Sequence, residues 1–326
     1  MRKLVAGIAA LLYIYVSSSL LLFAGPFTAL RGFVIDSLAT TRHQYLLRPL
    51  SLFLLSDAEI AAHMPHILDT NARVTSADMS VTEDFRNVTD NSIEIHDYTG
   101  RTFQAKVMLV HNPNLVKVAV TKDLGVAGQT VSEMVAENHA IAGINAGAFQ
   151  DVGWHGTGGM PLGITMHDGK LIGNDQSQWY QQPVIGITDE GVLVAGNYSV
   201  AQLKQLHVQE AVSFGPVLVR DGKGQVQGDG GWGLAPRTAI GQRADGTIIF
   251  VVTDGRFIHG PDNLGASLKD VQDIMLEYGA TIAVNLDGGS SSTMVYNGKL
   301  VNQPVDILGE RKVATAFIVM PNENRG

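Results

Sequence analysis

The chain has 326 residues and a formal net charge of −8 at pH 7. This length fits one large domain or two ordinary ones. The negative charge, together with the lack of a basic stripe, excludes partners that are recognised through a phosphate backbone, so we expect no nucleic acid. The chain contains no cysteine, which excludes disulfides and fits either side of a membrane.

The amino terminus carries an apolar run that is long enough to cross a bilayer. Residues 4–24 contain no charged side chain and match the ~20 residues that a transmembrane helix needs. No small-residue cleavage site is evident before Pro26, so we interpret residues 1–26 as an uncleaved signal anchor. Arg2 and Lys3 precede the run and predict a cytoplasmic amino terminus, although Arg31, Arg42 and Arg48 oppose this orientation. We therefore predict a single-pass protein of the cell membrane whose remaining chain is extracellular.

Two stretches of different composition follow the predicted anchor. Residues 27–69 have a broadly helical, apolar pattern, and residues 70–91 are polar and rich in Thr, Ser, Asp and Asn. The second stretch is typical of an exposed linker. We predict a membrane-proximal helical stalk and linker over residues 27–92 and one domain over residues 93–326.

Short apolar strands and turn signals dominate the predicted domain. Strands are expected at residues 102–110, 115–121, 140–144, 247–252, 281–286 and 313–320, and helices at 130–138 and 268–278. Ser267 and Asp270 predict a capping box for the second helix, and Gly279 predicts its end. Hairpin turns are expected at Asp168-Gly169, Glu190-Gly191, Asp221-Gly222, Asp245-Gly246 and Asn297-Gly298. The predicted fold class is α+β, with a large mixed, mainly antiparallel sheet and few helices.

Three buried strands are followed by a polar residue and then by glycine, directly or one residue later. The polar residues are Asn145, Asp254 and Asp287. Because sheet proteins place binding sites where strand ends group on one rim, we expect these three side chains in one cleft. Nearby arginines suit an anionic substrate, and structural ion pairing is an equally good interpretation for any one of them. These arginines are Arg237, Arg256 and Arg311.

The stretch from Asp287 to Thr293 is a turn rich in glycine and serine. It lies between two predicted strands, which excludes a Walker or dinucleotide loop because those loops run into a helix. Its glycines allow close backbone approach, and its hydroxyls can bind an anion or a sugar. A solvated hairpin loop is the equal alternative.

The glycine-rich loop at residues 151–161 adds Trp154 and His155 as candidates. Trp154 is either a sugar-stacking residue or a core plug. His155 and His259 can act as a general acid or base, but a loop histidine is more often simply exposed, so both rank below the aspartates. No cluster has zinc spacing, so we expect no cofactor. A divalent cation held by Asp254 and Asp287 stays open.

The motifs in order resemble those of the phosphodiester glycosidase family over residues 93–320. They are residues 145–149, 161–163, 214–216, 236–238, 254–256 and 286–293. The resemblance implies an α+β domain with a large mixed sheet, and hydrolysis of a sugar-1-phosphodiester at its glycosidic bond. It also implies an exported or membrane-tethered envelope protein linked to exopolysaccharide. Ala146 and Ser290 replace family glycines, so a backbone angle or the fit of the substrate can differ.

Breaking such a bond needs positive charge at the phosphate and a carboxylate near the anomeric carbon. We expect Arg237 and Arg311 to bind the phosphate, and Asp287 to act on the sugar with Asp254 as its partner. The predicted catalytic residues are Asp287, Asp254, Asn145 and His155. The predicted substrate-binding residues are Arg237, Thr238, Arg256, Gly288, Gly289, Ser291, Ser292, Arg311 and Trp154.

Two other functions fit the same residues. One is a non-catalytic envelope protein that binds anionic polysaccharide, and the other is a phosphodiesterase that cuts the P–O bond. The sugar, the aglycone, the anomeric outcome and the oligomeric state, a homodimer included, stay open.

Overall fold

A computed structural model of the chain describes residues 2–39, 46–62, 78–150, 158–173, 179–306 and 309–322. The chain forms two compact units, one containing Met1–Pro65 and one containing most of His66–Gly326. The helices of the first unit are α1 (Arg2–Phe23), α2 (Thr28–Ala39), α3 (Leu47–Leu50) and α4 (Asp57–Ala62). Of the described helices, α1 is the one long and apolar enough to cross a bilayer, a property that membrane anchors share with signal sequences.

The second unit is built from β-sheets in which every described strand pair is antiparallel. The seven-stranded sheet has the order β1 (Ile93–Thr99), β2 (Gln104–Val110), β15 (Ile248–Thr253), β14 (Thr238–Arg243), β16 (Ala280–Leu286), β12 (Val217–Arg220) and β13 (Lys223–Gly224). One five-stranded sheet has the order β10 (Leu193–Tyr198), β9 (Gln182–Thr188), β11 (Val208–Val212), β7 (Met166–His167) and β8 (Lys170–Leu171).

The other five-stranded sheet has the order β18 (Lys299–Leu300), β17 (Met294–Tyr296), β4 (Ala142–Asn145), β19 (Thr315–Val319) and β3 (Val116–Val120). A short ribbon pairs β5 (Phe149–Gln150) with β6 (Met160–Pro161). The α-helices of this unit are α5 (Val131–Glu137), α6 (Val200–Gln205) and α7 (Leu268–Glu277).

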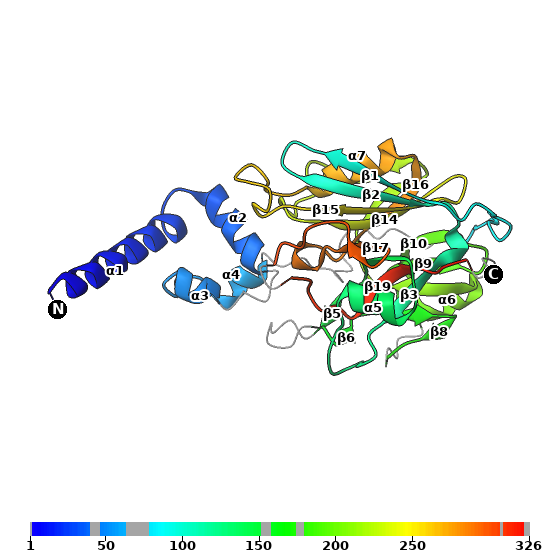
Figure 1. Cartoon of the computed structure of the whole chain (residues 1–326), viewed down its shortest axis with the longest axis horizontal. Coiled ribbons are helices and arrows are strands. Elements are labelled where there is room, and N and C mark those ends of the chain that lie inside the picture. Colours follow the sequence, from blue (N-terminus) through cyan, green and yellow to red (C-terminus); the bar gives the residue numbers. More distant parts are fainter. Residues whose placement is uncertain are drawn as a thin grey trace. The chain divides into compact units, whose positions relative to one another are not determined.

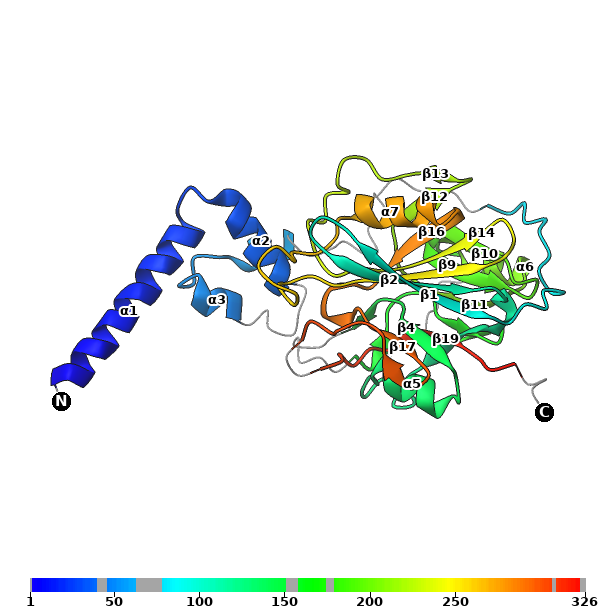
Figure 2. The same ribbon diagram turned by 45° about the horizontal axis from the view of Figure 1, so that its top comes forward.

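The sheets pack face to face, with helices on the outer faces. Phe250 and Val284 of the seven-stranded sheet share one core with Ile144 and Phe317 of the sheet that contains β4. On its other face the seven-stranded sheet packs on α7, and α5 packs on the outer face of the β4 sheet. Figures 1 and 2 show these layers, with α7 and α5 on opposite sides of the sheets.

The predicted fold class is confirmed: the unit consists mostly of antiparallel sheet with few helices, and an apolar helix begins the chain. The predicted large mixed sheet is instead divided into three antiparallel sheets. The division occurs because β2 pairs with β1 and β15, whereas β3, which follows β2 after a short turn, pairs with β19. Strands adjacent in sequence thereby enter different layers.

Local sequence signals explain several element boundaries. Ser267 and Asp270 form the predicted capping box of α7. Asp168-Gly169, Asp221-Gly222 and Asn297-Gly298 each have positive φ at both residues, as a two-residue hairpin turn requires. The described part of the predicted linker, residues 78–92, is bound to the β-rich unit, since Phe85 N donates to Glu190 O at 2.8 Å.

Candidate active site

The centre of the seven-stranded sheet brings two aspartates to one edge. β14 lies between β15 and β16 and is antiparallel to both, so β15 and β16 run in the same direction. Thr238, the first residue of β14, pairs with Val252 near the end of β15 and with Leu286 at the end of β16. Asp254 and Asp287 therefore emerge at the same end of the sheet, two strand spacings or about 10 Å apart.

Asn145 connects this edge to the neighbouring sheet. Its Nδ2 donates to the backbone oxygen of Asp287 at 2.5 Å, and its Oδ1 accepts from Thr238 Oγ1 at 2.8 Å and from Thr293 N at 3.1 Å. Asp287 N in turn donates to Ala146 O at 3.1 Å. The amide of Asn145 is fully buried, so the ends of β4 and β16 and the starts of β14 and β17 meet on one side chain.

Two arginines lie against the turn that follows Asp287. Arg311 is buried, donates from Nη1 to Ser290 Oγ at 3.3 Å, and lies over the ring of Phe149, with Cζ 5.0 Å from the ring centroid. A Cβ atom built on Gly289 would be 3.0 Å from Nη2 of Arg256, so this guanidinium rests directly on the turn. The turn therefore carries two positive charges beside one carboxylate.

Burial perturbs the charged groups of this cluster. Burial and the like charge of Arg311 lower the pKa of Arg256 to about 10, although Asp306 and Asp287 oppose the change. Burial raises the pKa of Asp287 above its ordinary value, against the opposing effects of Arg311, the Ser291 hydroxyl, a backbone N–H and Arg256. Both groups are thus less stable in their charged forms than they would be in water, as functional sites often arrange.

The serine and threonine side chains of the turn offer hydrogen-bonding groups to a ligand. Within the described chain, the hydroxyls of Ser292 and Thr293 are buried and have no hydrogen-bond partner. The Ser291 hydroxyl is close enough to Asp287 to lower its pKa. Because buried polar groups are normally hydrogen-bonded, two consecutive hydroxyls without a partner indicate a site that a ligand or water completes.

The turn after Asp287 needs glycine at positions 288 and 289. Positions 146 and 290, where alanine and serine replace family glycines, have no such need. Gly289 has φ +62°, and a Cβ on Gly288 would lie 2.7 Å from Pro236 O. Neither Ala146 nor Ser290 has a positive φ. The replaced family glycines therefore require no strained backbone here, and Ser290 supplies a hydroxyl that contacts Arg311.

Arg237, the third predicted phosphate-binding arginine, is bonded to the protein backbone. Its Nη2 donates to Trp232 O at 2.9 Å and to Gly233 O at 2.7 Å, and its Nε donates to Ala266 O at 3.1 Å. Its Cζ also lies 5.9 Å from the ring centroid of Trp232. The guanidinium thus joins two loops at the start of β14.

Asp254 is paired with the second histidine that the sequence suggested. Its Oδ2 lies 2.7 Å from His259 Nε2, and its Oδ1 accepts from Gln104 N at 2.7 Å and from Asn263 Nδ2 at 2.9 Å. Asp254 is buried, whereas a third of the His259 side chain is exposed. The carboxylate therefore fixes the orientation of an imidazole that solvent can reach.

Trp154 and His155 lie outside the described residues, so their predicted roles stay predictions. Sequence reasoning missed Asp306, which acts on Arg256, and Phe149, which lies under Arg311. Phe149 belongs to the first of the quoted motifs and could have been found by its proximity to Asn145. Asp306 stands in a polar loop without any distinguishing pattern.

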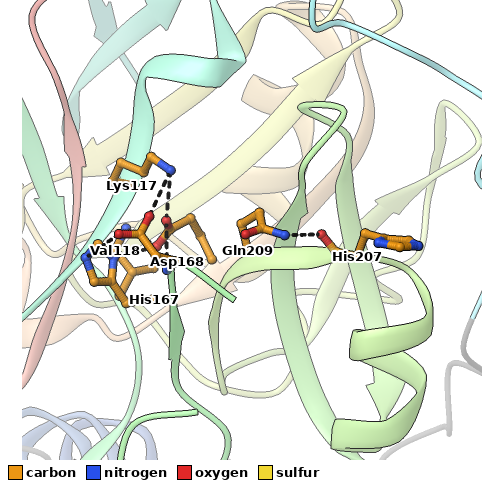
Figure 3. Close-up of polar contacts among 7 residues, drawn as sticks. Lys117, Val118, His167, Asp168, His207 and Gln209 are labelled. Carbon is orange, nitrogen blue, oxygen red and sulfur yellow. Dashed lines mark hydrogen bonds and ion pairs between the residues drawn. The ribbon is translucent and has the colours of Figure 1, made fainter. Parts of the chain in front are cut away.

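A second cluster of charged residues lies on β3, β7 and β11, away from this edge. His167, Asp168 and Glu210 have ligand atoms within 4.8 Å of one another, a spacing that could hold a metal ion. Lys117 Nζ, however, lies 3.2 Å from both Asp168 Oδ1 and Glu210 Oε1, and Glu210 also accepts from Val118 N (Figure 3). The ammonium group of Lys117 already pairs with both carboxylates, so we interpret the cluster as a structural ion-pair network.

Comparisons with known proteins relate most of the β-rich unit to one family. The phosphodiester glycosidase family model matches residues 138–320. The chain is 29% identical over 204 residues to the SPbeta prophage-derived uncharacterized protein YomE of Bacillus subtilis, covering 60% of this chain and 30% of that protein. It is 28% identical over 163 residues to mouse N-acetylglucosamine-1-phosphodiester alpha-N-acetylglucosaminidase, covering 44% of this chain and 30% of the mouse protein. The chain thus spans less than a third of these relatives.

A solved structure shares the fold. The catalytic domain of zebrafish N-acetylglucosamine-1-phosphodiester alpha-N-acetylglucosaminidase, described as auto-inhibited by its pro-peptide, superposes with a TM-score of 0.60 at 23% identity. The match covers 80% of this chain and 91% of the zebrafish chain. At this coverage the two chains share most of the architecture described above.

Proposed function

The chain belongs to the phosphodiester glycosidase family, and from this premise we propose that it hydrolyses the glycosidic bond of a sugar-1-phosphodiester. The observation that carries the proposal is the turn after Asp287, where Arg256 and Arg311 lie beside a carboxylate and the buried hydroxyls of residues 291–293. Paired guanidiniums suit a phosphodiester, and the hydroxyls suit its oxygens or those of a sugar.

The chemistry divides between the charges of the cluster. The phosphomonoester that departs when the C–O bond breaks is a good leaving group once its charge is matched, so Arg256 and Arg311 are assigned to the phosphate and stabilise it at that step. Asp287 is assigned to the sugar, where a carboxylate stabilises or attacks the electron-poor anomeric carbon. The raised pKa of Asp287 implies that activity falls at acid pH when this carboxylate becomes protonated.

The other predicted residues receive positioning roles in this proposal. Arg237 holds the loops at the start of β14 through three backbone carbonyls. Asn145 holds the backbone of Asp287 and the end of the turn. Phosphate binding, first expected of Arg237 and Arg311, is therefore assigned to Arg256 and Arg311, because these two guanidiniums interact with Asp287.

We also propose that α1 anchors the protein in the cell membrane and that the hydrolase acts on envelope or extracellular polysaccharide. The length and apolar composition of α1 support the anchor. Fractionation of cells with a protease-protection assay tests this part: the full chain should remain in the membrane fraction, with its β-rich unit accessible from outside. A mature protein cleaved near Pro26 would replace the anchor with a signal peptide.

The activity is tested by incubating the full chain, in detergent, with a panel of sugar-1-phosphodiesters that differ in sugar and aglycone. We expect release of a free sugar and a phosphomonoester from at least one member of the panel. Asp287→Asn should lose turnover and still bind that substrate. If no member is hydrolysed while anionic polysaccharide binds, the protein is a binding protein and the proposed activity is wrong.

A further inference from the structure

A cavity of about 540 Å³ opens at the same edge of the seven-stranded sheet. Its wall includes Asp254 and His259, residues of the β1–β2 hairpin such as Thr99 and Lys106, and the segment after β18 that contains Asn302. Its volume lies in the range of small-ligand pockets. All of its lining residues are described, and the arginine cluster is not among them.

The inner faces of β2 and β15 both change from apolar to polar toward this edge, β15 one inward position later than β2. Phe250 and Val252 on β15, and Met108 on β2, belong to the core between the sheets. The next inward positions toward the edge are Lys106 on β2, which pairs with Val252, and Asp254 after β15. Because side chains alternate along a strand, this change from apolar to polar gives the end of the core a polar wall.

The cavity adjoins the proposed phosphate site. Asn302 donates from Nδ2 to Ser292 O at 3.0 Å and accepts from Met294 N at 2.7 Å. One wall of the cavity is therefore bonded to the turn that carries the orphaned hydroxyls. Asp254 also lines the cavity, and it emerges at the same edge of the sheet as Asp287.

The charge of the wall excludes the phosphate itself. Asp97 and Asp254 contribute two carboxylates, and Lys106, which forms an ion pair with Asp97, contributes one ammonium. The wall is thus negative when His259 is neutral and has no net charge when it is protonated. An anion binds better at Arg256 and Arg311, whereas neutral hydroxyl groups match the amides, hydroxyl and carboxylate of this wall.

We propose that this cavity is a subsite for an uncharged glycosyl unit that is joined to the phosphate held by Arg256 and Arg311. This inference rests on the proposed function and names the group that lies next to the scissile phosphodiester. Since Nε2 of His259 faces Asp254 at 2.7 Å, its Nδ1 is the nitrogen free to point toward a sugar hydroxyl. The Asp254 and His259 pair thereby serves to orient the glycosyl unit.

The binding test uses the full chain in detergent, with two probes in ligand-observed saturation-transfer NMR. The probes are inorganic phosphate and a set of neutral methyl α-hexopyranosides with their 2-acetamido analogues. Thr99→Trp fills the cavity from an exposed position at the end of β1. Thr82→Trp makes the same change at an exposed position away from the cavity. Gln303→Ala, which removes a polar wall residue, is a second test that adds no bulk.

We expect a methyl glycoside and phosphate to bind the wild-type chain at the same time. Thr99→Trp should weaken glycoside binding about tenfold or more, equivalent to about 1.4 kcal/mol, and leave phosphate binding unchanged; Gln303→Ala should weaken glycoside binding to a smaller extent. Thr82→Trp should bind both probes normally. Competition between the probes, or normal glycoside binding by both cavity variants, would overturn the subsite.

Hydrolysis separates this inference from the proposed function. A failure of the glycoside to bind, with sugar-1-phosphodiester hydrolysis intact, overturns only the subsite. The second measurement compares the KM of Thr99→Trp with that of the wild type for two substrates, one with a methyl aglycone and one with a glycosyl aglycone. A higher KM of the variant for both substrates identifies the hydrolysed sugar as the occupant of the cavity. A higher KM for the glycosyl aglycone alone identifies the aglycone. An unchanged KM for both contradicts the proposal.

Discussion

Replacing Arg256 by methionine should stabilise the unliganded protein. Burial and Arg311 lower the pKa of Arg256 to about 10, about two to three units below that of an arginine in water. At about 1.4 kcal/mol for each pKa unit, the charged guanidinium costs the folded state about 3 kcal/mol. Methionine keeps an unbranched apolar side chain of similar length without the charge, so we expect a gain of about 1–3 kcal/mol in the free energy of unfolding.

Arg237→Met is the matched control, and its expected effect has the opposite sign. This substitution leaves the carbonyls of Trp232, Gly233 and Ala266 without their donor. The bond to Ala266 O is buried and the other two are partly buried; a buried polar group that loses its partner costs about 1–3 kcal/mol, so the variant should be less stable by at least this amount. The two variants remove the same group from one edge of the sheet and therefore separate a functional charge from a structural one.

The assay is thermal denaturation with and without phosphate. For a unit of this size, each kcal/mol corresponds to about 2–4 °C in Tm. Arg256→Met should melt at a higher temperature than wild type, yet lose the further rise in Tm that phosphate binding gives the wild type. A lower Tm for Arg256→Met, or an undiminished response to phosphate, would refute this account of the arginine pair.

Three further predictions concern the residues around Asp287. The pKa of Asp287 is raised in the folded state, so the ionised carboxylate lowers the stability of the fold at neutral pH. Asp287→Asn should therefore raise Tm at pH 7. This advantage should vanish as the pH falls to about 3.9, the pKa of an aspartate in an unfolded chain. A Tm difference independent of pH would contradict this. Gly289→Ala, at φ +62° and with its Cβ 3.0 Å from Arg256 Nη2, should cost about 1–3 kcal/mol and weaken phosphate binding, measured by urea denaturation and calorimetry; normal phosphate affinity would count against it. Asn145→Ala removes three hydrogen bonds and should cost about 2–4 kcal/mol in urea denaturation; a loss below 1 kcal/mol would show that these bonds contribute little.

The sequence was most informative where local chemistry decides the structure. The capping box at Ser267 and the turn at Asn297-Gly298 depend on neighbouring residues, and both occur as expected. The common edge of Asp254 and Asp287 also followed from the sequence, because each aspartate comes directly after a buried strand. Antiparallel pairing of both strands with β14 then places them at the same end.

Contacts between distant residues could not be predicted in this way. Arg237 and Arg256 both stand in short polar motifs, yet one is bonded to backbone carbonyls and the other lies against Gly289. The difference arises from how two loops meet, which neither motif encodes. The bond from Asn302 to Ser292 likewise depends on the course of the chain after β18.

The central claim is cleavage of the glycosidic C–O bond, and hydrolysis in ¹⁸O-labelled water tests it most directly. The full chain is incubated with a sugar-1-phosphodiester that it turns over, and the products are separated and examined by mass spectrometry, with Asp287→Asn as the inactive control. If water attacks the anomeric carbon, the label enters the sugar and the phosphomonoester stays unlabelled. Label in the phosphomonoester would mean that the P–O bond breaks, and would contradict the assignment of this protein as a glycosidase.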